Sequence, residues 1–523
     1  MYDILIKNGV IIDGTGKTKF LADVGIKDDK IVKVGELHDE YGEIEINASG
    51  KYVCPGFIDV NNHSDTYWQI FLNPNLESLI YQGITTIVGG NCGSSLAPLA
   101  KARAIETIQK WANINKISVN WLDLGEFFDF FEKRKIAVNF ATLVGHGTIR
   151  RGILDDQMRN PNSKEMAFIE RMLKNALDDG ALGMSSGLIY THARLAEREE
   201  LIRLAKILKK YGAIYVTHMR EESKGLLDSI EETIEVAKES KVKIHISHLK
   251  AIGRKNWHLM DEVLFHINQA KEEGLDITFD VFPYVNIGSV LYTLLPHWAT
   301  DGGRKMMLNR IRDSQIKAKI ILDMKKSDFD FKKIEISISS LDKTLSRRKI
   351  TEIAQSQGKE VEEALLDILV ASEGRVVISA DVLSEKNIED LLRHPLSIIS
   401  TNGVGYNLEH ARTGEMIHPR CFGSFSKVFR KYVLEKKILS WEEAVRKMTD
   451  LPAQKFGIKK RGKIENNYFA DLIVIDPKNI SDLSTSENPY QYSRGVDYMI
   501  VNGQILINEG QYTGLRNGEI IKL

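Results

Sequence analysis

Three residues of types that bind zinc each follow a run of apolar residues. Cys92 stands in Gly-Gly-Asn-Cys-Gly, His218 in Val-Thr-His-Met and His248 in Ile-Ser-His-Leu. A thiolate and two imidazoles form a plausible zinc site with a fourth position left for water, as catalytic zinc requires. A single Cys or His of this kind is more often a buried structural residue, so the prediction depends on all three meeting at one face of the fold.

The elements that would bring them together are buried parallel strands. Continuous apolar runs, each ending in Gly, His, Asn or Ser and each followed by a helix-like stretch, are typical of βα units. Eight of them predict a (β/α)8 TIM-like barrel, in which the chemistry lies at the carboxyl ends of the strands. The predicted strands are Phe57–Val60, Thr85–Gly90, Val138–Gly145, Ala181–Ser185, Ala213–His218, Val242–His248, Ile277–Phe282 and Leu396–Thr401.

Both chain ends have a different pattern, with short alternating apolar and polar runs separated by Gly and Asp turns. This pattern predicts antiparallel β structure and one small β-sandwich domain built from both termini. The interval between the seventh and eighth strands is too long for one helix, so we expect an inserted lid over the barrel mouth. The predicted segments are 1–54 (N-terminal half of the sandwich), 55–289 (strands one to seven), 290–388 (lid), 389–458 (strand eight and the last helices) and 459–523 (C-terminal half of the sandwich).

Composition excludes several classes of function. The 523 residues carry 71 basic and 71 acidic side chains, which leaves no electrostatic footprint for nucleic acid or an acidic membrane. The N-terminus has charges inside its apolar stretch, so we expect neither a signal peptide nor an anchor. Three widely spaced cysteines favour a reducing compartment, and we expect the cytoplasm.

The sequence resembles the D-aminoacylase (N-acyl-D-amino-acid deacylase) branch of the amidohydrolase superfamily. The resemblance implies a zinc-dependent hydrolase of N-acyl D-amino acids or related acylated amines, with one zinc held tightly by Cys92, His218 and His248 and a small acylated amino acid as its partner. The matching segments run nearly end to end. They are Pro55–Val60, Gly90–Gly93, Leu143–Thr148, Ser185–Leu188, Thr217–Arg220, Ser247-His248, Pro283-Tyr284, His418–Arg420 and Tyr468–Leu472.

The sequence departs from the family pattern at two positions. The family's His-x-His pair becomes Asn61-Asn62-His63, which keeps only the second imidazole, and its catalytic Asp becomes Asn402. An amide neither binds zinc well nor accepts a proton. We therefore expect the second metal position, with His63 as its remaining ligand, to be empty or impaired. The family's Asp performs proton transfers usually worth about 10²–10⁴ in rate, and Asp65 or His146 could replace it as the base.

The resemblance also implies a set of substrate contacts. Lys250, Tyr284 and Arg420 match the positions that bind the substrate carboxylate, and cations beside a phenol suit that task. Tyr190 is expected to line the pocket. His146, in a Gly-His-Gly turn, would polarise the substrate carbonyl, although a structural histidine is a fair alternative.

Two other functions stay open on the sequence. A barrel that has lost catalysis and serves as a binding protein is motivated by Asn61 and Asn402. A cyclic-amide hydrolase of the hydantoinase kind would need a carboxylated lysine on the fourth strand, and the stretch Gly180–Ser186 contains none. Acyl preference, chirality and oligomeric state have no signal in the sequence.

Overall fold

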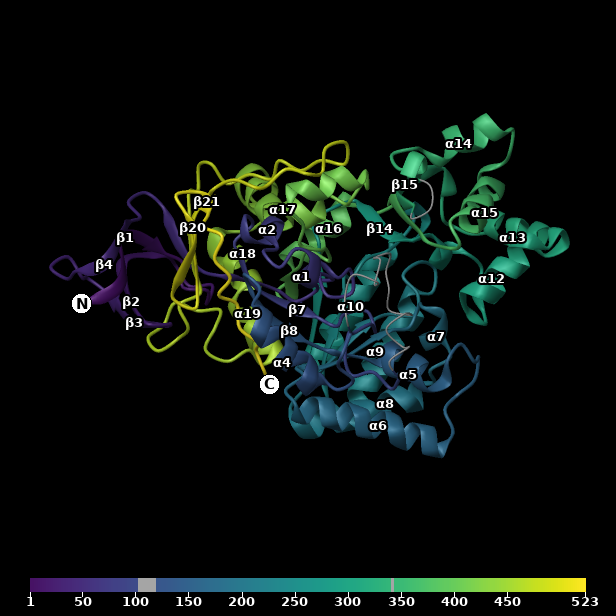
Figure 1. Cartoon of the computed structure of the whole chain (residues 1–523), viewed down its shortest axis with the longest axis horizontal. Helices are drawn as coiled ribbons and strands as arrows, with labels where there is room; N and C mark the ends of the chain where they lie inside the picture. Colours follow the sequence, from purple (N-terminus) through teal and green to yellow (C-terminus); the bar gives the residue numbers. More distant parts are fainter. Residues whose placement is uncertain (102–118, 340–342) are drawn as a thin grey trace.

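The two ends of the chain form one nine-stranded sheet. A computed structural model describes residues 1–101, 119–339 and 343–523. The sheet joins the ends where β18 pairs antiparallel with β5, and it lies at the far left of Figure 1, with purple and yellow strands side by side. The strands are β1 (Tyr2–Ile11), β2 (Phe20–Lys27), β3 (Lys30–Gly35), β4 (Gly42–Asn47), β5 (Tyr52–Pro55), β18 (Leu472–Ile475), β19 (Val496–Val501), β20 (Gln504–Asn508) and β21 (Gln511–Tyr512).

The middle of the chain holds two buried parallel sheets, in the orders β6-β7-β8 and β17-β13-β12-β11-β10-β9. All eight predicted strands overlap observed strands, and the third is divided into β8 and β9, one in each sheet. The observed strands are β6 (Phe57–Asp59), β7 (Ile84–Gly89), β8 (Asn139–Thr142), β9 (Val144–Gly145), β10 (Gly183–Gly187), β11 (Ile214–His218), β12 (Lys243–Ile246), β13 (Ile277–Val281) and β17 (Ser397–Ile399).

The two sheets contact each other at both edges. At one edge the backbone N–H of Leu182, just before β10, donates to the carbonyl of Thr142 in β8 at 3.0 Å. At the other edge a parallel bridge joins Asn62 to Gly403, and the N–H of His63 donates to the carbonyl of Gly403 at 2.8 Å. These contacts place the segments that follow β6 and β17 side by side.

Amphipathic helices cover the parallel strands. In α8, for example, Leu201, Leu204 and Leu208 recur at helical spacing and are buried, while its lysines face solvent. Capping boxes at Asp123 and Asn162 begin α4 and α6. The helices of this region are α1 (Gln69–Leu72), α2 (Glu77–Ile80), α4 (Leu124–Arg134), α5 (His146–Leu154), α6 (Ser163–Asp178), α7 (Thr191–Arg194), α8 (Arg198–Tyr211), α9 (Leu226–Ser240), α10 (Leu259–Glu272), α16 (Glu385–Arg393), α17 (Arg420–Lys427), α18 (Trp441–Met448) and α19 (Asp450–Phe456).

A separate module stands between β13 and α16, at the right of Figure 1. Its antiparallel sheet has the order β14-β16-β15, and its apolar core, which includes Ile336, Leu365 and Ile378, is a cluster of its own. The elements are β14 (Asn286–Val290), α11 (His297–Thr300), α12 (Gly303–Arg312), α13 (Ser314–Lys325), β15 (Ile334–Ser339), α14 (Ile350–Gln357), α15 (Val361–Ala371) and β16 (Val376–Asp381). No helix in the described ranges is both long and apolar enough to cross a membrane.

Candidate active site

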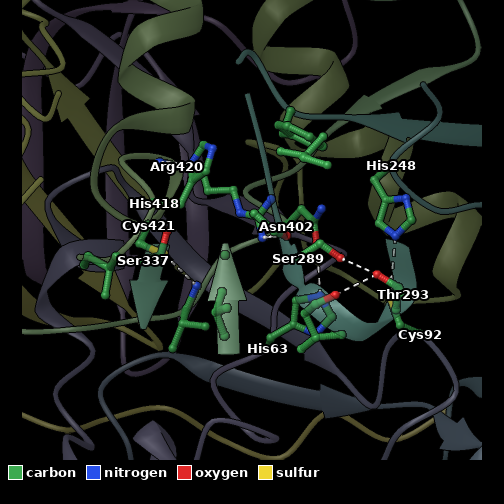
Figure 2. Close-up of a pocket in the computed structure, with 18 of the residues that line it drawn as sticks. His63, Cys92, His248, Ser289, Thr293, Ser337, Asn402, His418, Arg420 and Cys421 are labelled. Carbon is green, nitrogen blue, oxygen red and sulfur yellow. Dashed lines mark hydrogen bonds between the residues drawn. The ribbon is translucent and has the colours of Figure 1, made fainter. Parts of the chain in front are cut away.

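A cavity of about 130 Å³ lies where the carboxyl ends of the parallel strands meet the separate module between β13 and α16. Strand-end residues form one side of it, and β14, β15 and β16 supply an aliphatic wall that includes Val290, Ile338 and Val377. Figure 2 shows Cys92 and His248 on one side of the cavity and Arg420 and His418 on the other, with Asn402 between them.

The three predicted zinc ligands converge at this cavity. The Sγ of Cys92 lies 3.5 Å from Nε2 of His248, and that nitrogen lies 3.0 Å from Nδ1 of His218. One potential ligand atom from each residue falls within 4.8 Å of the other two, and all three side chains are buried. A single tetrahedral zinc ion could be bound by this set of atoms with small adjustments of the side chains.

The backbone around these residues is unusual. Cys92 (φ 53°), His248 (φ 38°) and Asn402 (φ 44°) all have the left-handed conformation that is uncommon for residues other than glycine. Gly90, just before the turn that carries Cys92, has no room for a side chain, because a Cβ would lie 2.0 Å from the carbonyl oxygen of Leu143. Backbone conformations of this kind concentrate at functional sites, where the surrounding structure holds them in place.

Glu222 is a site residue that the sequence analysis missed. Its buried carboxylate lies 3.1 Å from Nδ1 of His248 and 3.5 Å from Nε2 of His218, the ring nitrogens that face away from the cluster. It also accepts a hydrogen bond from Lys250. A carboxylate behind metal-binding histidines fixes the orientation and tautomer of the rings. The only sequence signal was an acidic residue four positions after His218. It lies on the loop after β11, and the tertiary fold brings this loop next to His248.

The titratable groups of the predicted zinc site shift one another's pKa values. Burial raises the pKa of Cys92, but the neighbouring charges and hydrogen bonds of His248 and His218 outweigh it and hold that pKa well below the usual range. Burial and Lys250 lower the pKa of His248, while Glu222 and Cys92 raise it to about 9 in total. Burial raises the pKa of Glu222, yet the charges of Lys250 and both histidines hold it well below its usual range. Cys92 is therefore stabilised as the thiolate that zinc requires.

The two amides that replace family residues lie in different surroundings. Asn402 lines the cavity, and its Oδ1 lies 3.0 Å from Nε2 of His63. Asn61 is not among the residues that line the cavity. Its amide donates instead to both carboxylate oxygens of buried Asp280, at 3.3 Å each. Asp280 also accepts from His245 and Ser400, so Asn61 belongs to a buried polar network beneath the cavity.

Arg420 and Lys250 both line the cavity, but they differ in the groups that contact their positive charge. The ammonium group of Lys250 is paired with Glu222. The guanidinium of Arg420 contacts the carbonyl of Gly288 at 3.4 Å, and its buried Nε has no hydrogen-bond partner within the described ranges. Burial lowers the pKa of Arg420. A half-buried cation that lines a cavity and has one unpaired donor is suited to bind a carboxylate.

The remaining predicted residues divide into two groups. Tyr190 lines the cavity, with its ring 5.4 Å from that of His218. Tyr284 is not among the residues that line the cavity, and its hydroxyl donates to the carbonyl of Pro419 at 3.3 Å. His146 also lies outside the lining and contacts Glu200 at 2.7 Å, a geometry that fits the structural alternative. The carboxylate of Asp65 accepts a hydrogen bond from the N–H of Gly90 at 2.7 Å, and this bond supports the turn before Cys92.

The chain is similar to known proteins along its whole length. The chain is 31% identical to the D-aminoacylase of Alcaligenes xylosoxydans xylosoxydans over 520 residues, which cover 99% of this chain and 97% of the relative. The crystal structure of N-acyl-D-glutamate deacylase from Bordetella bronchiseptica, in complex with zinc and a phosphonate inhibitor, superimposes with a TM-score of 0.84 at 28% identity, covering all of both chains. A D-aminoacylase structure described by its binuclear metal centre gives 0.85 at 29% identity, again covering both chains completely. The family model for the amidohydrolase family matches residues 45–294 and 410–507. The chain therefore belongs to the amidohydrolase family.

Proposed function

We propose that this protein is a zinc-dependent hydrolase that cleaves the amide bond of N-acyl D-amino acids. The observation that carries the proposal is the convergence of Cys92, His218 and His248 on one cavity that is also lined by Arg420, whose buried Nε has no hydrogen-bond partner among the described residues. A metal-ligand set and a carboxylate-binding cation are the two groups that this reaction needs from one pocket.

The residues fit a zinc ion. Two imidazoles and a thiol held in its thiolate form are typical zinc ligands, and the nitrogens that point away from the cluster face the carboxylate of Glu222. Zinc, when bound, supplies a Lewis acid and activates water as a nucleophile near neutral pH. The proposal assigns one zinc to these three residues and leaves the position near His63 without a carboxylate ligand.

The protein's own residues position the substrate. Arg420 would bind the α-carboxylate, and Tyr190 together with Val290, Ile338 and Val377 would contact the apolar part of the substrate and exclude water. Glu222 holds both imidazole rings in place. Asn402 accepts a hydrogen bond from His63 in the neutral tautomer protonated at Nε2, so in this form the pair is poised to orient a substrate but not to remove a proton.

The proposal also covers the barrel, the lid and the β domain of the fold. We infer that the two parallel sheets, in contact at both edges, form one eight-stranded barrel, that residues 290–388 act as a lid, and that both termini build the small β domain. The lid would begin a few residues earlier than the sequence predicts, because β14 starts at Asn286. The three free cysteines, all buried, support the prediction of a reducing compartment such as the cytoplasm.

A second candidate function is a non-catalytic binding protein with the same fold. The observation that favours it is the pairing of Asn402 with His63, which leaves no carboxylate at the position of the family's catalytic Asp. A cyclic-amide hydrolase has less support, because β10 (Gly183–Gly187) contains no lysine.

Turnover of a panel of N-acyl D- and L-amino acids by the zinc-loaded protein distinguishes the candidates. The proposal predicts hydrolysis of the D-series, monitored by release of free amine, in preference to the L-series and to cyclic amides. Tight binding of N-acyl amino acids without release of amine would favour the non-catalytic candidate instead.

A further inference from the structure

Asn402 is followed by Gly403, and the two residues are held in a chain of hydrogen bonds that ends on a buried carboxylate. The backbone N–H of Gly403 donates to Oγ1 of Thr401 at 2.9 Å, and this hydroxyl donates to Oδ2 of Asp59 at 2.5 Å. On the other side, Nε2 of His63 lies 3.0 Å from the side-chain oxygen of Asn402. With Nε2 of His63 protonated, the amide carbonyl has a donor on its oxygen, and the adjacent N–H is connected to a base, so the groups needed for acid–base catalysis are present.

Asparagine followed by glycine is the dipeptide most prone to cyclise, because no side chain hinders attack by the glycine nitrogen on the asparagine side chain. We propose that Asn402 is a self-modification site, at which the protein converts this asparagine to aspartate. The modification would place a carboxylate where the related deacylases carry their catalytic Asp, and in this respect it rests on the proposed function. The chemistry of the conversion itself does not depend on it.

The reaction consumes one water and releases ammonia. The nitrogen of Gly403 attacks Cγ of Asn402 and passes its proton to Thr401, which passes its own to Asp59, while His63 stabilises the charge that develops on Oδ1. The bond from Cγ to Nδ2 breaks, and the departing nitrogen takes a proton from a water that enters the cavity and leaves as ammonia. The hydroxide that remains adds to Cγ of the cyclic imide, the bond from Cγ to the Gly403 nitrogen breaks, and this nitrogen recovers its proton from Asp59 through Thr401.

Two further observations support the assignment. Asp59 is completely buried, and burial raises its pKa to about 6, which makes it a stronger base than an ordinary carboxylate. Asn402 lines the cavity, so water can reach the cyclic intermediate. The hydrogen-bonded His63, the relay from Gly403 through Thr401 to Asp59, and the cavity therefore supply the groups that the reaction needs around Asn402.

The chain carries three more Asn-Gly pairs, which serve as internal references: Asn8-Gly9, Asn502-Gly503 and Asn517-Gly518. Asn502 has the same left-handed backbone as Asn402 (φ 46° against 44°), but its amide donates to Asn139 and Asn517, and its buried Oδ1 has no hydrogen-bond partner among the residues that the structure describes. The amide of Asn8 donates to Asn47, and that of Asn517 to the carbonyls of Val501 and Asn502. Spontaneous ageing would affect all four pairs, whereas assisted conversion is specific to Asn402.

Peptide mass spectrometry of the full-length protein, sampled during incubation at neutral pH, tests the proposal. We expect position 402 to become aspartate at least ~10-fold faster than positions 8, 502 and 517, a threshold below the ~10²–10⁴ that positioned acid–base groups provide. Thr401→Val, which removes the hydroxyl relay, should slow conversion at 402 to the rate of the references, and Thr401→Ser should retain it. Melting curves identify any variant that fails to fold, and the comparison among the four sites of the wild-type chain needs no variant.

The outcomes separate this proposal from the proposed function. An unchanged Asn402 after the exposed Asn8 has converted, or mainly iso-aspartate at 402, overturns the self-modification. Hydrolysis by an engineered Asn402→Asp chain would leave the proposed function standing in that case. Conversion at 402 without turnover by either form would confirm the modification and contradict the function.

Discussion

The imidazole Nε2 of His63 lies 3.0 Å from Oδ1 of Asn402, so a histidine and an amide stand where the family pattern inferred from the sequence has a histidine and a carboxylate. A carboxylate at this point could accept and return a proton. The amide can do neither. In the proposed hydrolase, we therefore expect this pair to limit the rate of the unmodified chain.

Asn402→Asp should raise the rate of N-acyl amino acid hydrolysis. The substitution restores a proton acceptor with almost unchanged volume beside His63, and positioned acid–base groups contribute about 10²–10⁴ in rate. Measurement of kcat on freshly purified protein tests it. Asn467→Asp, at an exposed residue with the same left-handed backbone (φ 67°), is the matched control. A measurable wild-type rate that stays the same or falls in Asn402→Asp would show that another group already serves as the base.

Adding Asn61→His to Asn402→Asp should increase occupancy of a second metal position. The new imidazole, His63 and the new carboxylate would together supply three ligands. Metal content of the double variant against Asn402→Asp alone measures the effect. Asn61 donates to Asp280, so a second variant, Asn61→Ala, separates loss of that contact from gain of a ligand. Equal metal content in the double variant and in Asn402→Asp would contradict the expectation.

Glu222→Gln should weaken zinc binding by about 10–100-fold, the usual effect of removing a carboxylate behind metal-binding histidines. The carboxylate contacts both His218 and His248, and Gln keeps its shape without its charge. Competition with a chelator gives the dissociation constants. Glu221→Gln changes the neighbouring residue, which is paired with His297 instead, and should leave zinc binding unchanged. Equal affinities in the two variants would remove Glu222 from the site.

Capping the substrate carboxylate as an amide should cost about 2–5 kcal/mol of binding, the range for truncation of one partner of a buried charge pair. The buried Nε of Arg420 would lose the anion expected to bind it. Arg420→Gln should abolish the preference for the free acid, whereas Arg412→Gln, at a side chain that is 80% exposed, should retain it. KM for the free and capped substrates in each variant is the measurement, and equal KM values in the wild-type protein would place the carboxylate elsewhere.

Acid should destabilise the protein partly through His394. Its Nε2 contacts Asn268 at 2.9 Å while its Nδ1 accepts the N–H of Leu396 at 3.3 Å, a pattern that requires the neutral ring. Burial, with the charge of Lys447, lowers the pKa of His394 from 6.5 to about 4. The unfolded chain therefore binds more protons between these values, and the free energy of unfolding falls as the pH decreases from 6.5 to 4.

Denaturant titrations across this range measure the contribution of His394. His394→Asn, which keeps an acceptor near Leu396, should reduce the dependence of the unfolding free energy on pH. His258→Asn, at an exposed histidine, is the control. A slope in His394→Asn as steep as in the wild-type chain would contradict the assignment.

The parallel strands and the zinc ligands could be predicted from the sequence because both depend on local pattern. Cys92, His218 and His248 each follow an apolar run, and the carboxyl ends of parallel strands meet on one side. Glu222 could not be predicted, because only the tertiary path of its loop brings it to His248. Tyr284 follows β13 by three residues, yet its hydroxyl lies on the carbonyl of Pro419, and no sequence pattern gives that direction.

Zinc content of the purified protein, together with its Cys92→Ala variant, tests the central claim most directly. The account predicts one zinc per wild-type chain, and loss of most of this zinc and of any turnover in Cys92→Ala without loss of the fold, since the strands and helices that stabilise it lie away from the cluster. Cys421→Ala, at a buried cysteine that lines the same cavity outside the cluster, should keep its zinc. Two zinc ions at full occupancy in the wild-type chain, or a Cys92→Ala variant that still holds one, would contradict it.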